Sequence, residues 1–144
     1  MIKASLVIES RELTLAEISD AMARQPDQGY DRGSLAPVRQ VPREWTSWSA
    51  ELTWPPGAHG GTEGLATAIE SLGQPLAERA AKLASRGCEV VVSVHQELAD
   101  TPESLGLHLT PAAIRWLADA RAAVSVDQYV DSGDQYVDSG SDPT

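Results

Sequence analysis

Histidine and carboxylate side chains that could bind a metal ion lie in the second half of the chain. His95 and Glu97 follow a run of valines with strand-like alternation, so both side chains are expected on the strand face opposite the valines. His108 comes from the loop that follows. Two histidines and one carboxylate suit zinc, but their spacing is not that of an established zinc motif. We therefore favour a solvated polar face over a metal-dependent enzyme and expect no cofactor.

Cys88 is the only cysteine and the one candidate for a thiol nucleophile. Such a thiol needs a neighbouring histidine and an orienting carboxylate, and no local motif provides them. Its position between Gly87 and a valine-rich run predicts a small buried side chain instead. A single cysteine cannot form an internal disulfide, and the sequence shows neither a secretory signal nor a long apolar segment. These features predict a cytoplasmic protein.

A cluster of cationic and aromatic residues occupies the segment 26–43, whose glycines and prolines predict a loop. It contains Tyr30, Arg32, Arg39 and Arg43. Because arginine pairs bidentately with carboxylates, the cluster could bind an acidic peptide, including the chain's own C-terminal segment. The alternative is a surface loop whose arginines pair with nearby acidic residues.

The heptapeptide DQYVDSG occurs twice in succession, at 127–133 and 134–140. Two short copies cannot form a repeat architecture, which needs about three units. We therefore predict one domain over residues 1–130 and an acidic tail over 131–144. The duplicate is interpreted as a neutral disordered tail, as a hairpin that adds an edge strand, or as the modified core of a ribosomally made peptide precursor. The residues available to a partner or a tail-modifying enzyme are Asp127, Tyr129, Asp131, Ser132, Asp134, Tyr136, Asp138 and Ser139.

The charge of the chain points to a basic partner. The formal net charge is −10 and the isoelectric point is about 4.6. Nucleic acids and anionic membranes bind cationic surfaces, so neither is expected as a partner. A basic protein or peptide suits this charge better.

Hydrophobic periodicity predicts the elements that would position these residues. Period-2 alternation predicts strands at 2–9, 44–54 and 123–130, and a run of β-branched valines predicts another at 88–98. Trp48 should face the core from the second of these strands. Helix signals predict a capping box formed by Thr14 and Glu17, and two helices or one kinked helix over 62–86.

The last helix should begin at Thr110, with Pro111 in its first turn, and bury Ile114, Leu117 and Ala118. Together these signals predict an α+β fold. It would have a single sheet of about four strands, mixed or antiparallel, packed on helices in the order β-α-β-α-β-α-β.

Several segments resemble a family of bacterial domains of unknown function, numbered 4279, over about residues 3–130. The resemblance rests on Leu13-Thr14-Leu15-Ala16-Glu17-Ile18, Tyr30-Asp31-Arg32-Gly33, Trp48-Ser49, Leu109-Thr110-Pro111 and Val126-Asp127-Gln128-Tyr129. It implies a fold and no established activity. We therefore expect a non-catalytic partner-binding domain, with an immunity-like role by analogy to small acidic bacterial domains that neutralise basic toxins.

Overall fold

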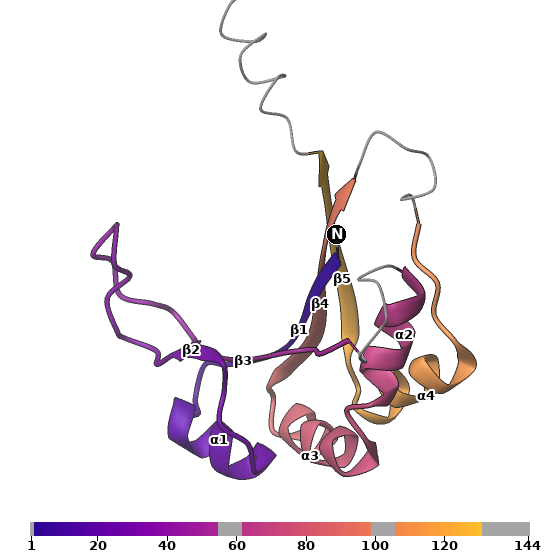
Figure 1. Cartoon of the computed structure of the whole chain (residues 1–144). Coiled ribbons are helices and arrows are strands. Elements are labelled where there is room, and N and C mark those ends of the chain that lie inside the picture. Colours follow the sequence, from indigo (N-terminus) through magenta and orange to yellow (C-terminus); the bar gives the residue numbers. More distant parts are fainter. Residues whose placement is uncertain (1, 55–61, 99–105, 131–144) are drawn as a thin grey trace, which may run out of the picture.

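A five-stranded sheet and four helices make up the part of the chain that the structure describes (Figure 1). The computed structural model describes residues 2–54, 62–98 and 106–130. The elements in chain order are β1 (Ile2–Ser10), α1 (Leu15–Met22), β2 (Gln28–Tyr30), β3 (Thr46–Glu51), α2 (Thr62–Glu70), α3 (Gln74–Ser85), β4 (Glu89–Leu98), α4 (Pro111–Asp119) and β5 (Ala123–Val130). The predicted α+β class is confirmed.

The sheet is mixed, with the strand order β2-β3-β1-β4-β5. The pairs β2–β3, β3–β1 and β1–β4 are antiparallel, whereas β4 and β5 are parallel. Parallel neighbours need a crossover connection, and α4 lies within the connection from β4 to β5. β1 occupies the centre of the sheet, so its register fixes β3 on one side and β4 on the other.

The helices lie on one side of the sheet and form the core with it (Figure 1). Alternate residues of β1 are buried there, and Trp48 from β3 is completely buried among them, as predicted. None of the described helices has the length and apolar character needed to cross a membrane. Besides Trp48, the large side chains with no exposed surface are Leu6, Ile8, Ile18, Leu65, Ile69, Leu83, Val92 and Val94. Burying an apolar side chain of this kind contributes about 1.5–3 kcal/mol.

Two of the helices, α1 and α4, begin after a threonine whose side chain caps a free backbone N–H group. The Thr14 side chain accepts a hydrogen bond from the Glu17 amide, and the Glu17 carboxylate accepts one from the Thr14 amide. The predicted capping box is therefore present, and it holds the pKa of Glu17 below its usual value through the bond to the Thr14 backbone. Thr110 caps α4 by accepting from the Ala113 amide, with Pro111 as the first helical residue.

The buried face of α4 differs from the prediction. Leu117 is buried, but Ile114 is 53% exposed and Ala118 also faces solvent. Ala113 and Trp116 take their places in the core. The Trp116 indole Nε1 donates a 2.8 Å hydrogen bond to the Gly73 carbonyl at the junction of α2 and α3. This bond and the bulk of the indole fix the rotation of the helix.

The predicted strand count of four is too low, and the order of elements changes with it. The additional strand, β2, lies in the segment predicted as a loop. Its three residues pair with β3, and next to them the Asp27 amide donates to the Ser49 carbonyl over 2.8 Å. Three residues are too few to show alternation. Over 62–86 the structure has two helices, and Gly73 at the start of α3 adopts a left-handed φ of 85° that favours glycine.

Candidate binding surface

The three predicted metal ligands do not come together. His95 and Glu97 lie on one face of β4, whereas Gln96 between them is buried on the helix face and donates to the Gly106 carbonyl. Gly106, two residues before His108, therefore lies on the helix side of the sheet. No three His, Cys, Asp or Glu side chains among the described residues could hold a metal ion together. His95 instead lies 3.8 Å from Asp127 of β5, between Nδ1 and a carboxylate oxygen.

Cys88 is buried, as its sequence position predicts. Burial raises the pKa of its thiol, and the smaller effects of its charged and polar neighbours do not reverse this direction. A raised pKa disfavours the thiolate, which is the nucleophilic form. The environment of Cys88 therefore suits packing better than nucleophilic chemistry.

The predicted cationic cluster is assembled only in part. The Arg43 guanidinium lies 4.0 Å from the centre of the Tyr30 ring and donates to the Ser34 hydroxyl. Arg32 donates from its guanidinium to the Arg11 carbonyl and from its amide to the Thr46 hydroxyl. Arg39 is exposed farther along the same loop. Arg32 and Arg43 thus bind groups in the loop, at its base and in the connection from β1 to α1, and none of these groups is an acidic residue of the alternative interpretation.

Two of the predicted tail residues lie within the described part of the chain, which ends at residue 130, and the others lie beyond it. Asp127 and Tyr129 belong to β5, where they pair with His95 and Glu97 of β4. Asp131, Ser132, Asp134, Tyr136, Asp138 and Ser139 lie outside the described residues. The division into a domain of residues 1–130 and a tail of residues 131–144 stays a prediction.

The face of the sheet opposite the helices, called here the open face, is polar and rich in carboxylates. No described helix or strand packs on it, and β1 exposes or half-exposes every second residue there. Strand register places small side chains at its centre and charged ones around them. Its positions on β3, β1, β4 and β5 are Ser47, Ser49, Glu51, Lys3, Ser5, Val7, Glu9, Glu89, Val91, Ser93, His95, Glu97, Ala123, Ser125, Asp127 and Tyr129. Five of these are carboxylates and one is a lysine.

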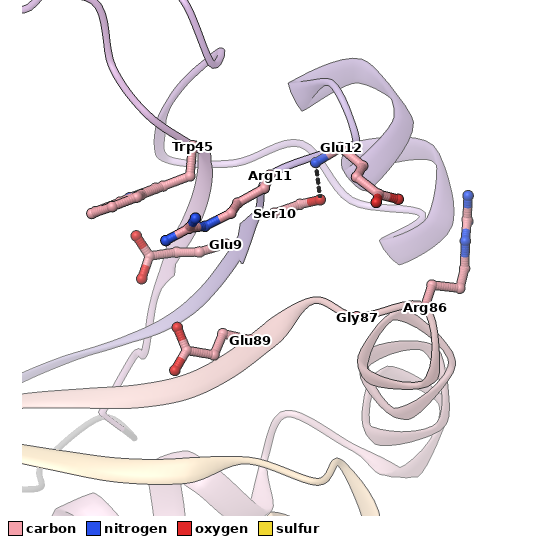
Figure 2. A pocket seen from close by; sticks show the side chains of 8 residues that line it. All are labelled: Glu9, Ser10, Arg11, Glu12, Trp45, Arg86, Gly87 and Glu89. Carbon is pink, nitrogen blue, oxygen red and sulfur yellow. Dashed lines mark hydrogen bonds between the residues drawn. The ribbon is translucent and has the colours of Figure 1, made fainter.

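A cleft of about 510 Å³ borders the open face where β1 ends and β4 begins. Glu9 and Glu89 line it from directly opposite positions of the two antiparallel strands. Figure 2 shows the two carboxylates on the same side, with the Trp45 ring and the Arg11 side chain above Glu9. Arg86 also lines the cleft but lies apart from the two carboxylates.

The surroundings of Glu9 in this cleft disfavour the negatively charged form of its carboxyl group. Burial raises the pKa of Glu9, and the nearby charge of Glu89 raises it further. The Trp45 indole N–H acts on the same carboxyl in the opposite direction, although its geometry falls short of a hydrogen bond. No described basic side chain forms an ion pair with either carboxylate. The cleft therefore holds two opposed carboxylates beside a buried, unpaired indole N–H.

Sequence reasoning did not identify Glu9, Glu89 or Trp45 as a site. Alternation in β1 and β4 places both glutamates on polar faces, which was readable from the sequence. Their opposition depends on the β1–β4 register, which no local pattern specifies. Trp45 precedes β3 and enters the cleft only because β3 pairs with β1.

A family model with the description "Domain of unknown function (DUF4279)" matches residues 1–131. This match covers most of the chain, and the chain therefore belongs to that family. No curated protein and no solved structure matches it.

Proposed function

We propose that this member of the DUF4279 family is a non-catalytic binding domain that takes a basic protein or peptide on the open face. The observation that carries the proposal is the opposition of Glu9 and Glu89 in the cleft beside Trp45. Like charges directly opposite on antiparallel strands destabilise a sheet. A cationic side chain from a partner would relieve this repulsion, so binding would recover free energy that the free domain lacks.

The chemistry of the cleft suits a lysine or arginine side chain. Carboxylates form charge-assisted hydrogen bonds with both cations, and an indole ring attracts a cation that lies over its face. The net charge of −10 would also steer a basic partner toward the domain and speed association at low salt. A cytoplasmic, immunity-like role belongs to the same proposal, since neutralising a basic toxin would use the same contacts.

The alternative of a peptide precursor receives less support from the structure. The first copy of the repeat begins inside β5, where residues 127–130 pair with β4. A modifying enzyme would have to open this end of the sheet to reach Asp127 or Tyr129 in an extended substrate conformation. The metal-dependent alternative has no assembled ligand set among the described residues.

The test is the affinity of the full chain for an oligolysine peptide, measured by isothermal titration calorimetry. The double variant Glu9→Gln, Glu89→Gln should bind about tenfold more weakly, equivalent to about 1.4 kcal/mol. Asp20→Asn with Glu78→Gln removes the same charge from exposed positions on α1 and α3 and serves as the matched control. Affinity should also fall as salt is raised. Equal losses in the two double variants would show that only net charge matters and would refute the cleft as the site.

A further inference from the structure

Residues 32–43, called here the arm, project from the sheet between β2 and β3 (Figure 1). The arm is a hairpin-like loop with large apolar side chains in solvent. Val38 is 94% exposed, Val41 is 56% exposed and Leu35 is 54% exposed. Apolar side chains gathered on one projecting segment are typical of a binding surface.

Backbone hydrogen bonds join the two sides of the arm. The Gly33 amide donates to the Arg43 carbonyl over 2.8 Å, and the Arg43 amide donates to the Ser34 carbonyl over 2.9 Å. Nearer the tip, the Ala36 amide donates to the Val41 carbonyl over 3.1 Å. A binding segment that is already ordered loses less conformational entropy when it docks. The arm is therefore suited to present its tip to another molecule.

The charge of the arm is opposite to that of the rest of the chain. Between residues 32 and 43 there are three arginines and no Asp or Glu, so the arm carries +3. Because the whole chain carries −10, the remainder carries −13. A second copy of the chain is thus an electrostatic partner for the arm, and opposite surfaces of this kind favour encounter and set orientation.

The open face offers the shape and the charge that the arm requires. Its centre carries small or half-exposed side chains, among them Val7 on β1 and Val91 on β4, which can contact apolar side chains from the tip. Glu9 and Glu89 border this centre and can pair with an arginine. In Figure 1 the arm extends away from β1 and β4 of its own sheet. The open face that the tip of the arm contacts would therefore be that of a second copy.

We propose that the arm of one copy docks on the open face of a second copy, with Val38 against the centre and Arg39 toward Glu9 and Glu89. The location of the docking surface rests on the proposed function. Each copy has one arm and one open face, so a two-fold dimer contains the contact twice. The basic segment that the open face binds is, in this arrangement, supplied by the chain itself.

The test is sedimentation velocity of the full chain over a series of protein concentrations. We expect a dimer whose dissociation constant rises about tenfold or more in Val38→Asp and in Arg39→Glu, as for interface residues worth above about 1 kcal/mol. Ile114→Asp introduces the same charge at another exposed apolar residue, on α4, and serves as the control that should leave dimerisation unchanged. Glu89→Arg should weaken the dimer alone and restore it in combination with Arg39→Glu.

A chain that stays monomeric at all concentrations would overturn the proposal, and so would arm variants that dimerise like the unchanged protein. Oligolysine titration separates this failure from failure of the proposed function. A monomer that binds oligolysine through Glu9 and Glu89 refutes the arm alone. Loss of both behaviours refutes the open face as a binding surface.

Discussion

Replacing Trp48 by alanine should cost about 3–5 kcal/mol of unfolding free energy. The side chain has no exposed surface, and its Nε1 donates a 3.3 Å hydrogen bond to the Arg24 carbonyl after α1. A buried indole removes roughly 150–250 Å² from water, and at about 25 cal/mol per Å² this corresponds to about 4–6 kcal/mol. Partial collapse of neighbouring side chains into the space would lower the cost toward the first range.

The assay is urea denaturation followed by far-ultraviolet circular dichroism, because other tryptophans complicate fluorescence. Trp45→Ala is the control, since the same substitution there removes a half-exposed ring at the cleft. Its cost should be clearly smaller. If Trp48→Ala costs no more than Trp45→Ala, the inward orientation of β3 is wrong, and with it the assignment of the open face.

Two further substitutions test local features of the fold and the cleft. Glu89→Gln should raise stability at pH 7 by about 0.2–1 kcal/mol, the size of a cross-strand charge interaction. The gain should shrink as pH falls through the raised pKa of Glu9, because protonation of Glu9 removes the same repulsion; destabilisation at pH 7 in urea denaturation would contradict this. Thr110→Val should cost about 0.5–2 kcal/mol in thermal denaturation, because the Ala113 amide loses its acceptor and Glu70 loses a 2.6 Å hydrogen bond. Thr110→Ser should retain most of this stability, and an unchanged melting temperature in the valine variant would refute the capping role.

Local features of the fold were readable from the sequence. The Thr14 capping box depends on residues three apart, and the Thr110–Pro111 start depends on adjacent ones. The rotation of α4 was not readable, because the bond from Trp116 to Gly73 joins distant segments. β2 escaped detection because a three-residue strand has no measurable period and gains its stability by pairing with β3.

The candidate binding surface depends still more on tertiary structure. The sequence indicated the arginines of the predicted cluster as a group, whereas in the structure Arg32 and Arg43 bind separate local groups that hold the arm. Alternation alone placed His95 and Glu97 on one face, whereas the position of Gly106 near His108 on the other side of the sheet was not encoded locally. Sequence patterns thus indicate which side chains share a strand face. The pairing of strands decides which side chains from different strands lie next to one another.

The most direct measurement is a nuclear magnetic resonance titration of the isotope-labelled full chain with oligolysine peptide. Binding in the cleft predicts saturable shifts of the Trp45 indole N–H and of the Glu9 and Glu89 amides, with little change on the helix side. Shifts confined to residues 131–144 or to the helices, with these three signals unmoved, would contradict the account.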